Sequence, residues 1–126
     1  MASSDCIVDS SVVIAFYRDG DSQHEKALKA MADLSGRTLL VHPYVIQETV
    51  TALSRKHGFD LAKRFLTDVM SGNNTIIVPV YINGDIDAFL SAERRMAFTD
   101  IALITLAKQT GAELLTFDEE MLSLLK

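Results

Sequence analysis

The chain of 126 residues lacks the features that several common classes of protein require. It has no tryptophan, and because it has only one cysteine an internal disulfide is excluded. Its longest unbroken apolar run, Val12 to Tyr17, is far shorter than the roughly 20 residues that a membrane span needs. The first residues contain no basic stretch leading into an apolar segment, which argues against a secretory signal. We therefore expect a cytoplasmic protein that does not enter a membrane.

Glycine and histidine are too scattered to form the usual sites. The six glycines are isolated from one another, so there is no glycine-rich loop that could cradle a phosphate. The three histidines lie in separate segments without nearby cysteine or histidine partners, which makes a zinc site a poor fit. No G-x-S-x-G elbow is present either. These absences disfavour a nucleotide switch, a zinc enzyme and a serine hydrolase.

Positive charge is also scarce. The 17 acidic residues outnumber the 12 basic ones, which gives a net charge of −5. A surface of this sign should repel nucleic acid unless bound cations reverse the local field. Apolar residues, at 48%, and charged residues, at 23%, are close to globular averages. With the short length, this composition predicts one folded domain over residues 1–126.

Strands and helices are predicted to alternate along the chain. Short apolar or β-branched runs predict strands over 6–8, 38–41, 75–80 and 113–117. Helical spacing of apolar residues predicts helices over 12–17, 22–34, 43–57, 60–70, 85–96 and 101–107. We expect Ser10 or Ser11, a Ser22–Glu25 capping box and Asp85 to cap three of these helices. The alternation predicts a three-layer α/β fold, with helices on both faces of a mostly parallel sheet.

Four acidic residues fall where such a fold binds ligands. Asp9 closes the first predicted strand, Asp118 closes the last, Asp100 begins a buried helix, and Glu48 lies in the first two turns of the helix after Pro43. Parallel strands bring their carboxyl ends to one edge of the sheet, so these carboxylates could gather there. Setting the four aside leaves 13 of the 17 acidic residues against 12 basic ones, so most of the net charge lies in this group.

Each acid also has a local explanation. Asp9 could accept hydrogen bonds in a strand-to-helix turn, and Asp100 could favour its helix dipole. Asp118 could begin a solvated acidic helix turn. Glu48 falls opposite the apolar stripe of its helix, the usual place for a solvated glutamate. The residues alone leave both interpretations open.

The order and setting of the four acids resemble a known family. The segments Cys6–Val12, Pro43–Glu48, Phe98–Leu103 and Leu114–Asp118 together resemble the PIN domain and, within it, the VapC-like toxin ribonucleases. The resemblance implies strand order 3-2-1-4-5 and a Mg²⁺- or Mn²⁺-dependent endoribonuclease. It also implies an RNA substrate, cut to leave a 5′-phosphate and a 3′-hydroxyl, with a homodimer and an antitoxin as the protein partners. Asp9, Glu48 and Asp100 match the three core acids of the family, and Asp118 matches its more variable fourth.

The residue types agree with that chemistry. Oxygen-only ligands select hard cations such as Mg²⁺ or Mn²⁺. We assign Asp9 and Asp100 to direct metal ligation, Glu48 to a second-metal or water-mediated contact, and Asp118 to an outer position. Ser10 and Thr99 match small hydroxyl positions beside the acids of the family and are expected to support them.

Two other functions are compatible with an α/β domain of this size. A phosphoacceptor receiver domain should carry paired acids after the first strand and a lysine after the last. Here Asp9 stands alone and no lysine follows the last strand until Lys126. The other alternative is a PIN-fold module that only binds a partner, which the intact set of acids disfavours.

Overall fold

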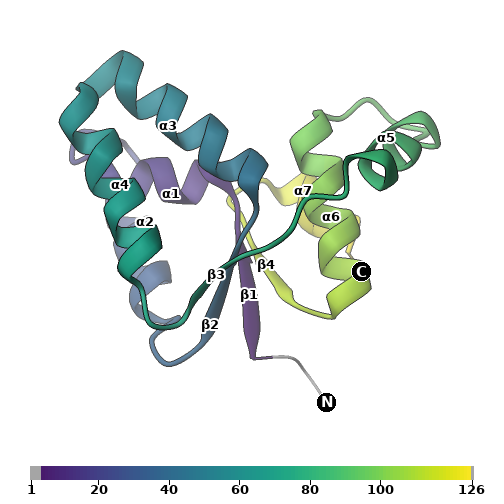
Figure 1. Ribbon diagram of the computed structural model, residues 1–126, viewed down its shortest axis with the longest axis horizontal. Coiled ribbons are helices and arrows are strands. Elements are labelled where there is room, and N and C mark those ends of the chain that lie inside the picture. The colour runs from purple at the N-terminus through teal and green to yellow at the C-terminus, as the bar shows by residue number, and fades with distance from the viewer. Residues whose placement is uncertain (1–3, 126) are drawn as a thin grey trace.

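The computed structural model describes residues 4–125 (Figure 1). Its sheet has four parallel strands, β1 (Asp5–Val8), β2 (Thr38–Val41), β3 (Thr75–Ile77) and β4 (Glu113–Leu115). They lie in the order β3-β2-β1-β4, with β1 paired to both β2 and β4. The predicted α/β class and the first four places of the strand order are therefore confirmed.

The expected fifth strand is absent from the described residues. After β4 the chain turns at Asp118 into a short helix, α7 (Glu119–Ser123). The Asp118 side chain caps this helix, and Glu119 and Glu120 occupy its first turn, where negative charge is favoured by the helix dipole. The residues that follow β4 therefore form a capped helix, and the described sheet has four strands where the resemblance implied five.

Two groups of helices cover the sheet from opposite sides, as Figure 1 shows. On one side lie α1 (Ser10–Tyr17), α2 (His24–Ala32), α3 (Pro43–His57) and α4 (Phe59–Ser71). On the other lie α5 (Ile82–Leu90), α6 (Phe98–Thr110) and α7. The first group includes α3 and the second includes α6, and a hydrogen bond from Thr99 to Glu48 joins these two helices.

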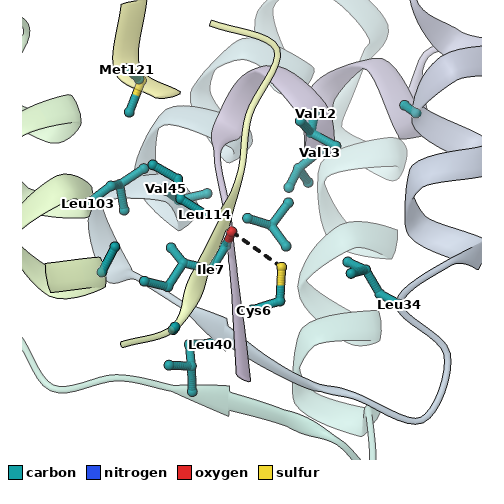
Figure 2. Packing of buried hydrophobic residues seen from close by; sticks show 14 of the residues in the cluster. Cys6, Ile7, Val12, Val13, Leu34, Leu40, Val45, Leu103, Leu114 and Met121 are labelled. Carbon is teal, nitrogen blue, oxygen red and sulfur yellow. Dashed lines mark hydrogen bonds between the residues drawn. The ribbon is translucent and has the colours of Figure 1, made fainter. Parts of the chain in front are cut away.

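The central strand β1 forms the middle of the hydrophobic core. Cys6 and Ile7 are fully buried, and Figure 2 shows their side chains on opposite faces of the sheet. Cys6 faces Val13 and Leu34, whereas Ile7 lies on the side of Leu103. This alternation follows from the two-residue repeat of a strand. Both faces of the sheet carry apolar side chains along β1, so Asp9 falls just beyond the core, at the carboxyl end of the strand.

Several predicted element ends are wrong. Helix α2 begins at His24, with Gln23 as an N-cap that makes no side-chain bond, so the Ser22–Glu25 capping box does not form. Helix α5 ends at Leu90, well before the predicted Met96, and Asp85 lies within its first turn instead of capping it. The N-cap of α1 is Asp9, one residue before the predicted serine caps. The strands β3 and β4 also end early, at Ile77 and Leu115.

The ends of α3 agree with the prediction. Pro43 occupies the first turn of the helix, and Gly58 follows its last residue, His57, with a φ of 93° that favours glycine. Among residues 4–125 no helix is both long and apolar enough to cross a membrane.

Candidate functional site

Asp9 lies at the carboxyl end of β1 and is 5% exposed. Its Oδ2 accepts hydrogen bonds from the hydroxyls of Thr116, at 2.7 Å, and Ser11, at 3.1 Å. Its backbone N–H donates to Leu115 O at 2.9 Å, which extends the β1–β4 pairing to the turn. Both side-chain bonds use Oδ2, so within the described residues Oδ1 is left to accept a further partner.

Glu48 lies in the second turn of α3 and is half-buried. Its Oε1 accepts from the hydroxyl of Ser10 on α1 at 3.0 Å, and its Oε2 accepts from Thr99 on α6 at 3.1 Å. The carboxylate therefore joins three helices. The solvated position that the helical pattern favoured is not what the structure shows, because α1 and α6 contribute hydroxyls on this face of α3.

Asp100 lies in the first turn of α6 and is half-buried. Burial raises the pKa of its carboxyl from 3.8 to about 6, and the negative charges of Asp9, Asp118 and Glu48 add to the shift in that order. No hydrogen bond to its side chain is found within residues 4–125. The ionised form of Asp100 is therefore disfavoured, first by burial and then by the three neighbouring carboxylates.

Asp118 serves two local purposes. Its Oδ1 accepts from the backbone N–H groups of Glu120, at 2.9 Å, and Met121, at 3.3 Å, and so caps α7. Its own N–H donates to the hydroxyl of Thr116 at 3.0 Å. The interpretation of Asp118 as the start of an acidic helix therefore describes its local structure, while its charge still reaches Asp100.

The structure thus brings all four predicted acids to one edge of the sheet, with both predicted hydroxyls bound to Glu48. Asp9 is held by Ser11, expected only as a possible helix cap, and by Thr116, for which the sequence pattern predicted no role. Thr116 belongs to the segment Leu114–Asp118 on which the resemblance rested. A hydroxyl two residues before a strand-end aspartate was the signal that could have identified it.

The donor set suits a hard divalent cation held with the help of water. No three His, Cys, Asp or Glu side chains of residues 4–125 converge closely enough to hold a metal ion by themselves. A closed site of the kind that holds structural zinc is therefore not formed by this part of the chain. Mg²⁺ usually takes only one or two carboxylates and completes its shell with water and substrate phosphate. The oxygens of Asp9 and Asp100 fit an ion bound in that way.

The fold and the site define an α/β domain whose acidic side chains gather at the carboxyl edge of a parallel sheet. The chain belongs to the PIN domain family, since the model of that family matches residues 6–124. A search of curated proteins finds no match.

Among solved structures, the chain is similar to the crystal structure of Mycobacterium tuberculosis VapC20, a sarcin–ricin loop cleaving toxin. The two share 20% sequence identity, with a TM-score of 0.82 and 94% of each chain covered. At this level of identity the similarity supports the fold.

Proposed function

We propose that this protein is an endoribonuclease that depends on Mg²⁺ or Mn²⁺ and acts as the toxin of a toxin–antitoxin pair. The observation that carries the proposal is the gathering of four acidic side chains at the carboxyl edge of a PIN-domain sheet, where ligands bind and where their negative charges repel one another. A divalent cation relieves such repulsion and attracts a phosphate to an otherwise acidic surface. The proposed location of the protein is the cytoplasm, where it would meet its proposed RNA substrate.

The hydrogen bonds suggest a separate part for each acid. Asp9 and Asp100 are the proposed metal ligands, because Oδ1 of Asp9 and both oxygens of Asp100 accept no hydrogen bond from the described residues. Glu48, held at both oxygens by Ser10 and Thr99, is fixed in position and suited to orient a water molecule. Asp118 acts from an outer position, since its Oδ1 caps α7.

A bound Mg²⁺ or Mn²⁺ would lower the pKa of a coordinated water and stabilise negative charge on the phosphate under attack. The protein supplies the fixed geometry around that chemistry. Thr116 and Ser11 hold Asp9 in one orientation, and Ser10 and Thr99 do the same for Glu48. Hydrogen bonds of this kind orient metal-binding carboxylates and tune their affinity.

An RNA cleavage assay tests the proposal. The purified protein should cut RNA in Mg²⁺ or Mn²⁺ and stop in excess EDTA, and Asp100→Asn should abolish cutting. Asp60→Asn is the matched control, because Asp60 is also in the first turn of a helix but is exposed on α4. Binding of RNA or of a partner without any cleavage would instead support the non-catalytic module, and full activity in EDTA would contradict the proposed metal.

The proposed protein partners are an antitoxin and a second copy of the chain. Helix α5 has no buried residue, and Ile82, Ile86, Phe89 and Leu90 along it are exposed. An exposed apolar surface of this kind is typical of a protein interface. Light scattering of the purified protein should show a dimer, and Ile86→Glu should convert it to a monomer if α5 forms the contact.

A single cooperative unfolding transition would support the proposal that residues 1–126 form one domain.

A further inference from the structure

A pocket of about 200 Å³ lies between the residue that caps α3, the segment that leads into α5, and the face of α6 that carries Thr105. The polar residues that line it are His42, Asp85, Thr105 and Gln109. None of these is among the four acids. The pocket and the acids share two helices, since Thr105 follows Asp100 on α6 by five residues, or about 7 Å along the helix axis.

His42 is a buried donor at this pocket. It is 4% exposed, and its Nδ1 accepts the backbone N–H of Tyr44 at 3.0 Å. Because Nδ1 accepts, the neutral ring carries its proton on Nε2. Burial lowers the pKa of His42 below its ordinary value, against a smaller opposing effect of Asp85, which keeps the ring neutral at physiological pH. Within the described residues the Nε2–H has no hydrogen-bond acceptor.

Acceptors predominate on the other walls. The carboxylate of Asp85 takes one hydrogen bond, from the hydroxyl of Tyr44 at 2.7 Å, and has further lone pairs to offer. The hydroxyl of Thr105 donates its proton to Ile101 O at 2.8 Å, so its oxygen can only accept in the pocket. A complementary ligand therefore presents two or more N–H groups next to one carbonyl oxygen.

Aromatic rings fix the pocket and offer a surface for stacking. Tyr44 packs against His42, with ring centroids 4.3 Å apart, and against Phe98 at 5.6 Å. Tyr81 lines the pocket and is 79% exposed. A Cβ at Gly84 would lie 3.3 Å from Tyr81 Cδ1, so the missing side chain lets this ring lie across the first turn of α5. Exposed aromatic rings stack on nucleobases, since every base has a π-face.

We propose that this pocket binds a guanine base of the RNA, with Asp85 accepting from the base N–H groups and His42 donating to its carbonyl oxygen. Guanine is the one standard base whose pairing edge has two adjacent N–H groups beside a carbonyl. The pocket is linked to the acidic site through α6, which carries Asp100 in its first turn and Thr105 five residues later. The inference rests on the proposed ribonuclease function for its RNA, but base binding itself needs neither metal nor cleavage. Binding of a base would also provide affinity for RNA that a chain of net charge −5 cannot obtain from its overall charge.

The test is an NMR titration of the full chain in EDTA with guanosine, inosine and adenosine 5′-monophosphates. Guanosine monophosphate should shift the amide signals of residues 80–85 and 102–109. Inosine monophosphate, which lacks the exocyclic amino group, should bind more weakly, and adenosine monophosphate weakest. Equal affinity for the guanine and adenine nucleotides, or no shift at these residues at millimolar concentration, would overturn the proposal.

Two substitutions separate base binding from folding. Asp85→Asn keeps an oxygen for the Tyr44 hydroxyl but replaces an acceptor with an N–H group, so affinity for guanosine monophosphate should fall by roughly 10-fold or more. His42→Asn keeps a capping oxygen for the Tyr44 N–H and removes the Nε2 donor, with a loss of similar size. Gln47→Ala, exposed on α3, is the control and should change nothing. Unaltered affinity in both pocket variants contradicts the assignment.

Cleavage assays distinguish a failure of this inference from a failure of the proposed function. If the protein cleaves RNA but does not bind guanine, the proposed function stands and the proposed guanine pocket is refuted. If the protein binds guanine but does not cleave RNA in Mg²⁺ or Mn²⁺, the guanine pocket stands and the proposed function is refuted. If both hold, Asp85→Asn should relax a preference for guanine at one fixed position relative to the cut, whereas Gln47→Ala should leave that preference unchanged.

Discussion

Replacing Asp100 with asparagine should stabilise the metal-free protein at high pH. The pKa of Asp100 is raised from 3.8 to about 6 by burial and by three neighbouring carboxylates. A shift of about 2 pKa units corresponds to roughly 3 kcal/mol of unfavourable free energy for the ionised form. Because Asp100 is only half-buried and water screens its neighbours, we expect Asp100→Asn to raise the free energy of unfolding by only about 1–2 kcal/mol at high pH.

The sign of the effect depends on pH. Below about pH 4, Asp100 is protonated in both the folded and the unfolded chain, so it adds no penalty. As the pH rises through the window between 3.8 and about 6, the unfolded chain loses this proton first and the wild type is progressively destabilised. Above that window both states are ionised and the penalty is complete. The stability difference between Asp100→Asn and wild type should therefore grow from near zero to its full value across the window.

Urea denaturation in EDTA at a series of pH values measures this difference. Asp60→Asn provides the control, since it removes an exposed first-turn aspartate that faces no such cluster and should change stability by no more than about 0.5 kcal/mol at any pH. Saturating Mg²⁺ should reverse the order of stability, because a ligand that binds only the folded wild type stabilises it. A pH-independent difference, or a less stable Asp100→Asn at high pH, would refute the reasoning.

Three further outcomes are expected. Glu48→Gln should weaken Mg²⁺ binding and slow RNA cleavage by roughly 10²-fold, and equal affinity with equal rate would remove Glu48 from the site. Thr116→Val should cost about 1–3 kcal/mol in urea denaturation, because Asp9 loses its shortest hydrogen bond while buried, whereas Thr116→Ser should cost less. Asp9→Asn should abolish cleavage with the fold retained by circular dichroism, and wild-type turnover in this variant would show that the metal is held elsewhere.

Local sequence was enough to predict most of the regular structure. Pro43 and Gly58 mark the two ends of α3 because each acts on the backbone at its own position, through a fixed φ or a positive φ. The nearly all-apolar stretch after Asp100 predicts a buried helix, and Ile101, Ala102, Leu103, Ile104 and Ala107 of α6 are buried. The order of the four acidic motifs along the chain was sufficient to indicate the family.

Local sequence was misleading where two structures compete for the same residue. Aspartate is a common helix cap, which is why Asp85 was expected to cap α5. The helix begins three residues earlier, and the Asp85 carboxylate accepts a hydrogen bond from the Tyr44 hydroxyl instead. Ser22 and Glu25 match a capping box, yet the turn before α2 is held by Asp21, whose Oδ1 accepts the Gln23 N–H at 2.8 Å. At Asp118 the local pattern was a better guide, since the acidic run that could begin a helix does begin α7.

What the sequence determined by itself is the set of elements, the acids that end or begin them, and the family that their order indicates. What only the tertiary structure decided is how those acids are held. The bond from Ser10 to Glu48 spans 38 residues, that from Thr99 to Glu48 spans 51, and that from Thr116 to Asp9 spans 107. Propensities and caps act over a few residues, so they are visible in short segments. A hydrogen bond between distant residues exists only after the sheet and both helix layers have packed, which is why the face of α3 that carries Glu48 could not be assigned from its helical pattern.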